Sequence, residues 1–188
     1  MRVRETAKKE IEEKFSEMGD YMRLEYLSSC LKNHLDFDTR KFVLVKLSGL
    51  FETKGMFLDA GRMMKSAAEI NTNKQSKIND FVKGAELFIR GGDYDKAEIS
   101  MRKALSLADE KQTTEIKNSV KEFYKTQARS CIEKNKRKQA VEVYEKYLTM
   151  QLDETEREEI RKKLLNLYEE IGDFVKYGNL KKRIDGLG

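Results

Sequence analysis

The chain has 188 residues with no Pro and no Trp, and 38% of its side chains are charged. This length suits one domain or a short repeat array, and a chain without Pro lacks the strongest helix breaker. Lys and Arg number 38 against 33 Asp and Glu, and the excess is spread evenly, with +2 in residues 1–94 and +3 in residues 95–188. Composition therefore predicts an all-α protein and argues against a disordered chain or a linearly segregated nucleic-acid-binding region.

Apolar residues recur at helical spacing in four consecutive segments of the chain, which predicts four amphipathic helices. The stripes are Ile78, Phe81, Val82, Ala85, Phe88; then Ala97, Met101, Ala104, Leu105, Ala108; then Ile116, Val120, Phe123, Tyr124, Ala128, Cys131; and Ala140, Val143, Tyr144, Tyr147, Leu148. We expect Tyr144 and Tyr147 to be core residues whose hydroxyl groups reach solvent.

Gly-Asp pairs punctuate these segments at Gly19-Asp20, Gly92-Asp93 and Gly172-Asp173. We expect each Gly to adopt a left-handed conformation that ends one helix, and each Asp to cap the next. Superimposing the turns at Gly19, Gly55, Gly92, Asn135 and Gly172 gives spacings of 36, 37, 43 and 37 residues. Self-similarity at such a period predicts five helix pairs, over residues 3–35, 38–71, 75–109, 113–151 and 154–185, within a single domain spanning 1–188.

The third pair resembles the tetratricopeptide (TPR) repeat family, through Gly84-Ala85, Phe88, Gly92, Tyr94 and Ala97. The second and fourth pairs follow the pattern with Leu44, Ser48, Phe51, Gly55, Phe57, Ala60, Met64 and Ala67, and with Tyr124, Ala128, Cys131, Asn135, Ala140, Tyr144 and Tyr147. The resemblance implies a right-handed α-solenoid of about five antiparallel helix pairs. The chain departs from the family pattern at Asp109, which replaces the closing Pro of the third pair. The two end pairs depart from it at Glu12, Leu24, Leu165 and Tyr177. Such departures are expected of capping repeats, or of a divergent solenoid similar to the soluble vesicle-fusion adaptors.

The sequence offers little for catalysis or for binding a cofactor. The single histidine, His34, excludes a His-pair zinc motif and gives a nucleophile only one candidate base, beside Asp36 and Asp38. Cys30 and Cys131 belong to no CxxC motif, which favours a reducing, cytoplasmic location. We therefore expect no catalytic residue, no metal and no cofactor. We also expect no signal peptide. We expect no membrane span, because the longest apolar stretch, 42–51, is too short.

The TPR resemblance implies that the first helix of each pair lines a concave groove that binds a partner. The positions that it places there are Lys46, Asn79, Val82, Lys83, Glu86, Arg90, Lys125, Arg129, Lys162, Lys163 and Asn166. Lys162 and Asn166 match two positions at which some members clamp a terminal carboxylate, although the rest of that clamp is missing. The cationic track predicts a non-catalytic adaptor for an acidic peptide or helix of a partner protein.

Three alternatives remain open. The net charge of +5 and the pI of about 9.0 are also typical of a basic helical-repeat protein that binds RNA. A second interpretation, which we weigh equally with binding, is that the groove lysines are ordinary solvated side chains. A third is an enzyme, which would have to use carboxylates such as Asp36 and Asp38. Independently, a short solenoid exposes its end helices, so Ile11 and Phe15 at one end with Leu180 and Ile184 at the other predict a homodimer through the terminal helices.

Overall fold

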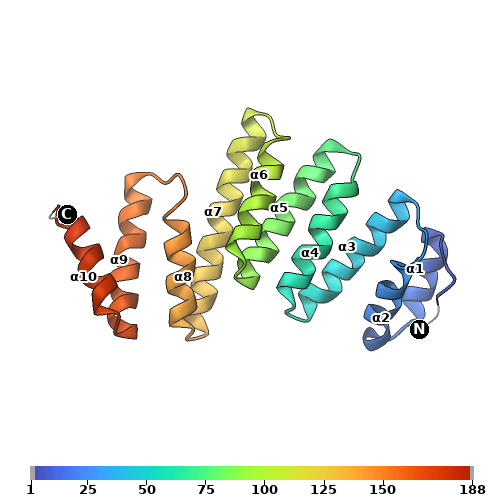
Figure 1. Cartoon of the computed structure of the whole chain (residues 1–188), viewed down its shortest axis with the longest axis horizontal. Helices are drawn as coiled ribbons and strands as arrows, with labels where there is room; N and C mark the ends of the chain where they lie inside the picture. The colour runs from blue at the N-terminus through green and yellow to red at the C-terminus, as the bar shows by residue number, and fades with distance from the viewer. Residues whose placement is uncertain (1–2, 187–188) are drawn as a thin grey trace. The chain divides into compact units, whose positions relative to one another are not determined.

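The structure is a computed structural model that describes residues 3–186, and within them it contains helices and no strands. The ten described helices (Figure 1) are α1 Lys8–Glu17, α2 Asp20–Cys30, α3 Phe37–Thr53, α4 Phe57–Ile70, α5 Lys74–Gly91, α6 Tyr94–Leu105, α7 Glu110–Glu133, α8 Arg137–Tyr147, α9 Glu154–Ile171 and α10 Phe174–Ile184. The all-α prediction is confirmed for this part of the chain. Turns of two or three residues follow α1, α3, α5, α7 and α9.

Four of these turns have the same backbone construction. Gly55, Gly92, Asn135 and Gly172 have φ angles of 73°, 80°, 57° and 74°. The N–H of the residue after each one donates to a carbonyl five residues back, on Phe51, Phe88, Cys131 and Tyr168, at 2.8–2.9 Å. This pattern is the Schellman motif, in which a left-handed residue lets the chain satisfy the last helical carbonyls. The predicted equivalence of these four turns therefore extends to their hydrogen bonds.

The capping role of Asp is confirmed at two turns and is wrong at the third. Asp93 and Asp173 accept hydrogen bonds from the backbone N–H groups of Lys96 and Lys176. Gly19, in contrast, has an extended conformation with φ −72° and is itself the N-cap residue of α2, while Asp20 is already helical. Because the backbone leaves α1 in an extended conformation at Met18, this turn needs no left-handed residue.

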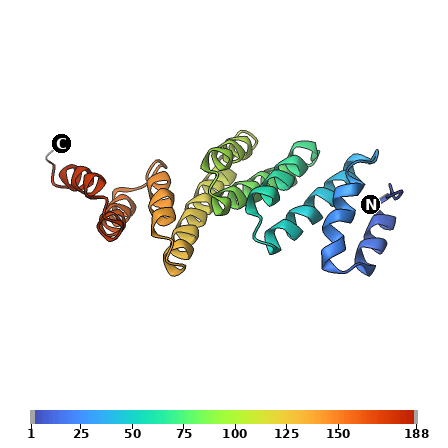
Figure 2. The same ribbon diagram turned by 60° about the horizontal axis from the view of Figure 1, so that its bottom comes forward.

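The contacts of the chain fall into two compact units that divide within α7, between Val120 and Lys121. In the first unit, α3 packs on α4, α4 on α5 and α5 on α6, as neighbouring helices in both views (Figures 1 and 2). In the second unit, α9 packs against both α8 and α10. Ala60, Ala97 and Ala140, which the repeat pattern aligns in three successive pairs, are all buried.

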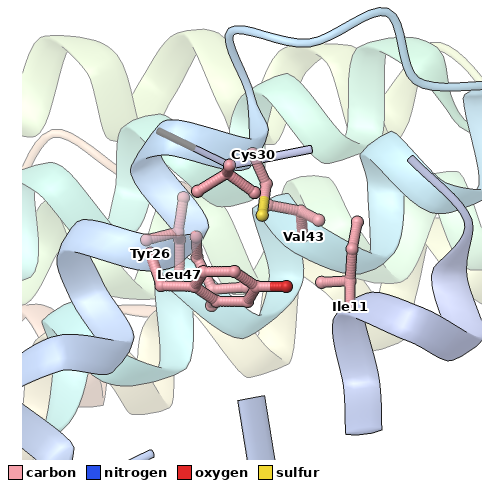
Figure 3. Packing of buried hydrophobic residues seen from close by; sticks show 7 residues of the cluster. Ile11, Tyr26, Cys30, Val43 and Leu47 are labelled. Carbon is pink, nitrogen blue, oxygen red and sulfur yellow. The ribbon is translucent and has the colours of Figure 1, made fainter. Parts of the chain in front are cut away.

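One core cluster of the first unit joins α1, α2 and α3. Ile11, Tyr26, Cys30, Val43 and Leu47 lie together there, each fully or almost fully buried (Figure 3). Burial raises the pKa of the Cys30 thiol, so this cysteine is held neutral as a packing residue.

The burial of Ile11 corrects one expectation about self-association. Ile11 is covered by α2 and α3, and the Arg23 guanidinium lies 4.9 Å from the centre of the Phe15 ring. Ile11 is therefore unavailable to a second copy of the chain. On α10, Leu180 is half-buried and Ile184 exposed, beside exposed Phe174 and Val175. A homodimer through the terminal helices stays a prediction. Of the four residues predicted to form it, only Ile184 on α10 is exposed.

Candidate functional site

In the first unit, the predicted groove residues Lys83, Glu86 and Arg90 belong to an ion-pair network rather than to a free cationic surface. All three lie on α5, and Glu52 at the end of α3 completes the network. The Lys83 ammonium lies 3.1 Å from Glu52 and 3.0 Å from Glu86. Arg90 pairs with the same two carboxylates, and its guanidinium lies 4.1 Å from the centre of the Phe57 ring. Two cations face two anions, so this network ties α3 and α4 to α5.

The other predicted residues of the first unit make local contacts. The Lys46 ammonium lies over the rings of Phe15 and Phe42, 5.6 Å and 5.4 Å from their centres, as a cation–π pair does. Asn79 is exposed and its side-chain oxygen accepts from Gln75 at 3.1 Å. Val82 is half-buried on the same helix. Their shared binding role stays a prediction.

Replacing Glu52 with Gln should lower the free energy of unfolding at pH 7 by about 1 kcal/mol, because Lys83 and Arg90 then share only Glu86. Burial acts to raise the pKa of Glu52, but Lys83 and Arg90 together hold it below the ordinary value of 4.5. A lowered pKa stabilises the fold above pH 4.5 and stops doing so as the pH falls through the folded-state value. Urea unfolding followed by circular dichroism should therefore show the difference between wild type and variant shrinking below pH 4.5.

The control for this prediction is Glu98→Gln. Glu98 forms one exposed ion pair, 3.7 Å from Arg102 on its own helix, and such pairs contribute little. An equal loss in both variants, or a loss in Glu52→Gln that persists at acid pH, would contradict the assignment of Glu52 to a stabilising network.

In the second unit, α7, α8 and α9 enclose a hollow of about 230 Å³. Its wall contains three of the predicted cations together with aromatic and acidic side chains: Lys125, Arg129, Tyr144, Tyr147, Glu156, Glu159, Ile160 and Lys163. We call it the cationic hollow. The helix pattern explains the grouping, since Lys125 and Arg129 lie one turn apart on α7, and Glu156, Ile160 and Lys163 repeat at three- and four-residue spacing on α9.

Lys125 is neutralised by acidic neighbours, whereas two other cations of the hollow are not. Its ammonium lies 3.2 Å from Glu122, which raises the pKa of Lys125, and 3.4 Å from Glu156. Lys121, 2.6 Å from Glu156, and then Lys125 hold the pKa of that carboxylate below its ordinary value. Arg129 is exposed and the Lys163 ammonium lies 5.9 Å from the centre of the Tyr144 ring, and neither forms an ion pair within residues 3–186.

Tyr147 places a buried polar atom at the wall of the cationic hollow. The residue is 1% exposed, and its ring stacks on Tyr124 with the ring centres 5.9 Å apart. Its hydroxyl has no hydrogen-bond partner among the described residues. Burial raises the pKa of Tyr147 to about 12, although the nearby Lys125 charge opposes the rise. The burial predicted for Tyr147 is confirmed, but its hydroxyl does not reach solvent as predicted, because the ring lies fully beneath the surface.

A second hollow of about 240 Å³ adjoins the first on α9 and shares Lys163 with it. Its wall is mainly apolar and contains Ile132, Arg137, Lys163, Asn166, Leu167 and Glu170, and we call it the apolar hollow. Arg137 and Glu170 form an ion pair with each other. The predicted residue Asn166 lies here, whereas Lys162 is exposed and lines neither hollow.

Sequence reasoning missed several residues of these surfaces, among them Glu52, Glu156 and Ile132, and it did not anticipate the burial of the Tyr147 hydroxyl. Ile132 is 46% exposed and lies next to Cys131 but outside the apolar stripe of its helix. An apolar residue outside the stripe is the one sequence signal that could have identified it as a surface residue. Glu52 carries no local signal, because it is 31 residues from Lys83.

The catalytic alternative gains no support from the geometry of its carboxylates. Asp36 caps α3, accepting from the Thr39 backbone N–H at 2.7 Å and the Thr39 hydroxyl at 2.8 Å, and these bonds hold its pKa low. His34 lies exposed in the connection between α2 and α3. Among residues 3–186 no cluster of three or more His, Cys, Asp or Glu is arranged to hold a metal ion. Within the same range no helix has the length and apolarity needed to cross a membrane.

Comparison with known proteins adds no family to these observations. The sequence matches no protein-family model and no curated protein. The TPR resemblance therefore rests on the residues and turns of this chain alone.

Proposed function

We propose that this protein is a non-catalytic adaptor of the TPR-like type, a right-handed α-solenoid that binds an acidic peptide or helix of a partner protein. The observation that carries the proposal is the cationic hollow, where Arg129 and Lys163 have no ion-pair partner in the described chain. A carboxylate entering this hollow would pair with both of these exposed cations. The free thiols of Cys30 and Cys131 agree with a reducing, cytoplasmic location.

The proposal places the binding contacts mainly on α7 and α9. Lys83 and Arg90 already share two carboxylates, so an acidic ligand would have to break existing ion pairs to reach them. Lys125 is likewise paired, and we assign it to holding Glu156 in place. Arg129 and Lys163 carry the positive charge that is left for a ligand, and the Glu159 carboxylate in the same wall partly offsets it.

Reversing the charge of Arg129 and Lys163 should weaken binding of acidic peptides about tenfold or more. The probe is a fluorescein-labelled pool of seven-residue peptides, each with one or two Glu among Ser, Gly and Leu, followed by fluorescence anisotropy at physiological salt. Arg129→Glu and Lys163→Glu place a negative charge where the ligand carboxylate would bind, and like charges repel at such distances. Lys138→Glu is the matched control, because Lys138 is exposed on α8 and belongs to neither hollow.

Equal weakening by all three variants would mean that only net charge matters and would contradict a discrete site. The RNA alternative is tested in the same assay with a labelled single-stranded RNA of about 20 nucleotides. Binding to that RNA that falls steeply with salt, together with no binding of the acidic pool, would replace the adaptor with an RNA-binding protein.

A further inference from the structure

The two hollows of the second unit adjoin each other on α9 at Lys163, which contributes to both. Their chemistry differs. The cationic hollow offers Arg129 and Lys163 to an anion, whereas the apolar hollow offers the side chains of Ile132 and Leu167. Ile132 is 46% exposed, so apolar surface is open there that a ligand side chain can cover.

We infer that the ligand is an acidic segment that also carries one aliphatic side chain, with the carboxylate bound at Arg129 and Lys163 and the aliphatic group bound against Ile132 and Leu167. This inference rests on the proposed function and adds the second recognition element. Charge complementarity selects the acidic residue, and the exposed apolar wall selects the residue beside it.

The spacing of the two ligand side chains follows from α9. On α9, Lys163 binds the carboxylate and Leu167 the aliphatic group, and four residues of helix rise about 6 Å. An extended peptide advances about 3.3 Å per residue, so the acidic and aliphatic side chains lie about two positions apart. Asn166 and the Arg137–Glu170 pair line the same apolar hollow and offer polar groups to the peptide backbone between the two side chains.

The test uses labelled peptides of one length with Ser and Gly as filler. One set carries Glu and Leu one to four positions apart, a second carries Glu with Ser in place of Leu, and a third carries Leu with Ser in place of Glu. We expect the full chain to bind the best Glu–Leu peptide about tenfold more tightly than its Glu–Ser partner. Ile132→Ser should abolish that preference, so that the variant binds the Glu–Leu peptide no more tightly than the Glu–Ser peptide, and circular dichroism checks that the variant is folded.

The outcomes separate this inference from the proposed function. Equal binding of Glu–Leu and Glu–Ser peptides by the wild-type chain overturns the aliphatic element and leaves the acidic-peptide function standing. A Leu preference that survives Ile132→Ser overturns the assignment to the apolar hollow. Failure of every Glu-containing peptide, or Leu–Ser peptides that bind as tightly as Glu–Leu peptides, overturns the proposed function itself, and the inference with it.

Discussion

Replacing Leu47 with Ala is expected to lower the free energy of unfolding by about 2–5 kcal/mol. Leu47 is 1% exposed and packs in the cluster where α1, α2 and α3 meet. Removing the larger side chain loses the favourable free energy of transferring its apolar atoms out of water. It also leaves a cavity between three helices that can close only partly. Urea unfolding monitored by circular dichroism at 222 nm measures the loss.

The same helix offers a control two residues earlier. Val45 is 36% exposed, so Val45→Ala removes apolar atoms from a position that is already in contact with water. Its cost should remain below about 1 kcal/mol, and the higher helix propensity of Ala than of Val reduces it further. Comparable losses in the two variants would contradict the core that joins α1 to α2 and α3.

The helices and turns of this chain were predictable because their signals are local. The Gly92-Asp93 pair ends α5 and caps α6 within a few residues, and the same backbone chemistry appears at Gly172-Asp173. The alignment also placed Asn135 at a turn without a glycine, and its positive φ agrees with that alignment. Gly19 is an exception to this local prediction. A Gly-Asp pair specifies a left-handed turn only where the preceding helix continues up to the Gly, and α1 ends before Gly19.

The candidate site was predictable only in part because the partners of a charge are distant in sequence. Lys125, Arg129 and Lys163, three of the cations that the resemblance placed in the groove, line one hollow, since all three follow helix register. The resemblance could not show that Glu52 and Glu156 neutralise Lys83 and Lys125, because those pairs depend on how neighbouring helices pack. For the same reason the burial of the Tyr147 hydroxyl could not be predicted from sequence, because it depends on how α7, α8 and α9 pack together.

Replacing Gly61 with Ala is expected to lower the free energy of unfolding by about 1–2 kcal/mol, although Ala favours helix more than Gly does. Gly61 lies in α4 against α5, and a Cβ atom built there would be 2.9 Å from two carbons of the Phe88 ring. Phe88 is fully buried, so its ring has no free space to move into. The two helices would have to separate slightly, which loosens the packing of Ala60, Met64 and Leu87 around them.

The opposite sign is expected for Gly49→Ala, and this contrast makes the Gly61 prediction specific. Gly49 lies within α3, is exposed, and has no atom within 4 Å of a Cβ built on it. Ala should therefore raise the free energy of unfolding by about 0.5–1 kcal/mol through helix propensity alone. Chemical denaturation of the two variants beside wild type measures both signs. Stabilisation by Gly61→Ala would mean that α4 and α5 do not approach as closely as the contact with Phe88 requires.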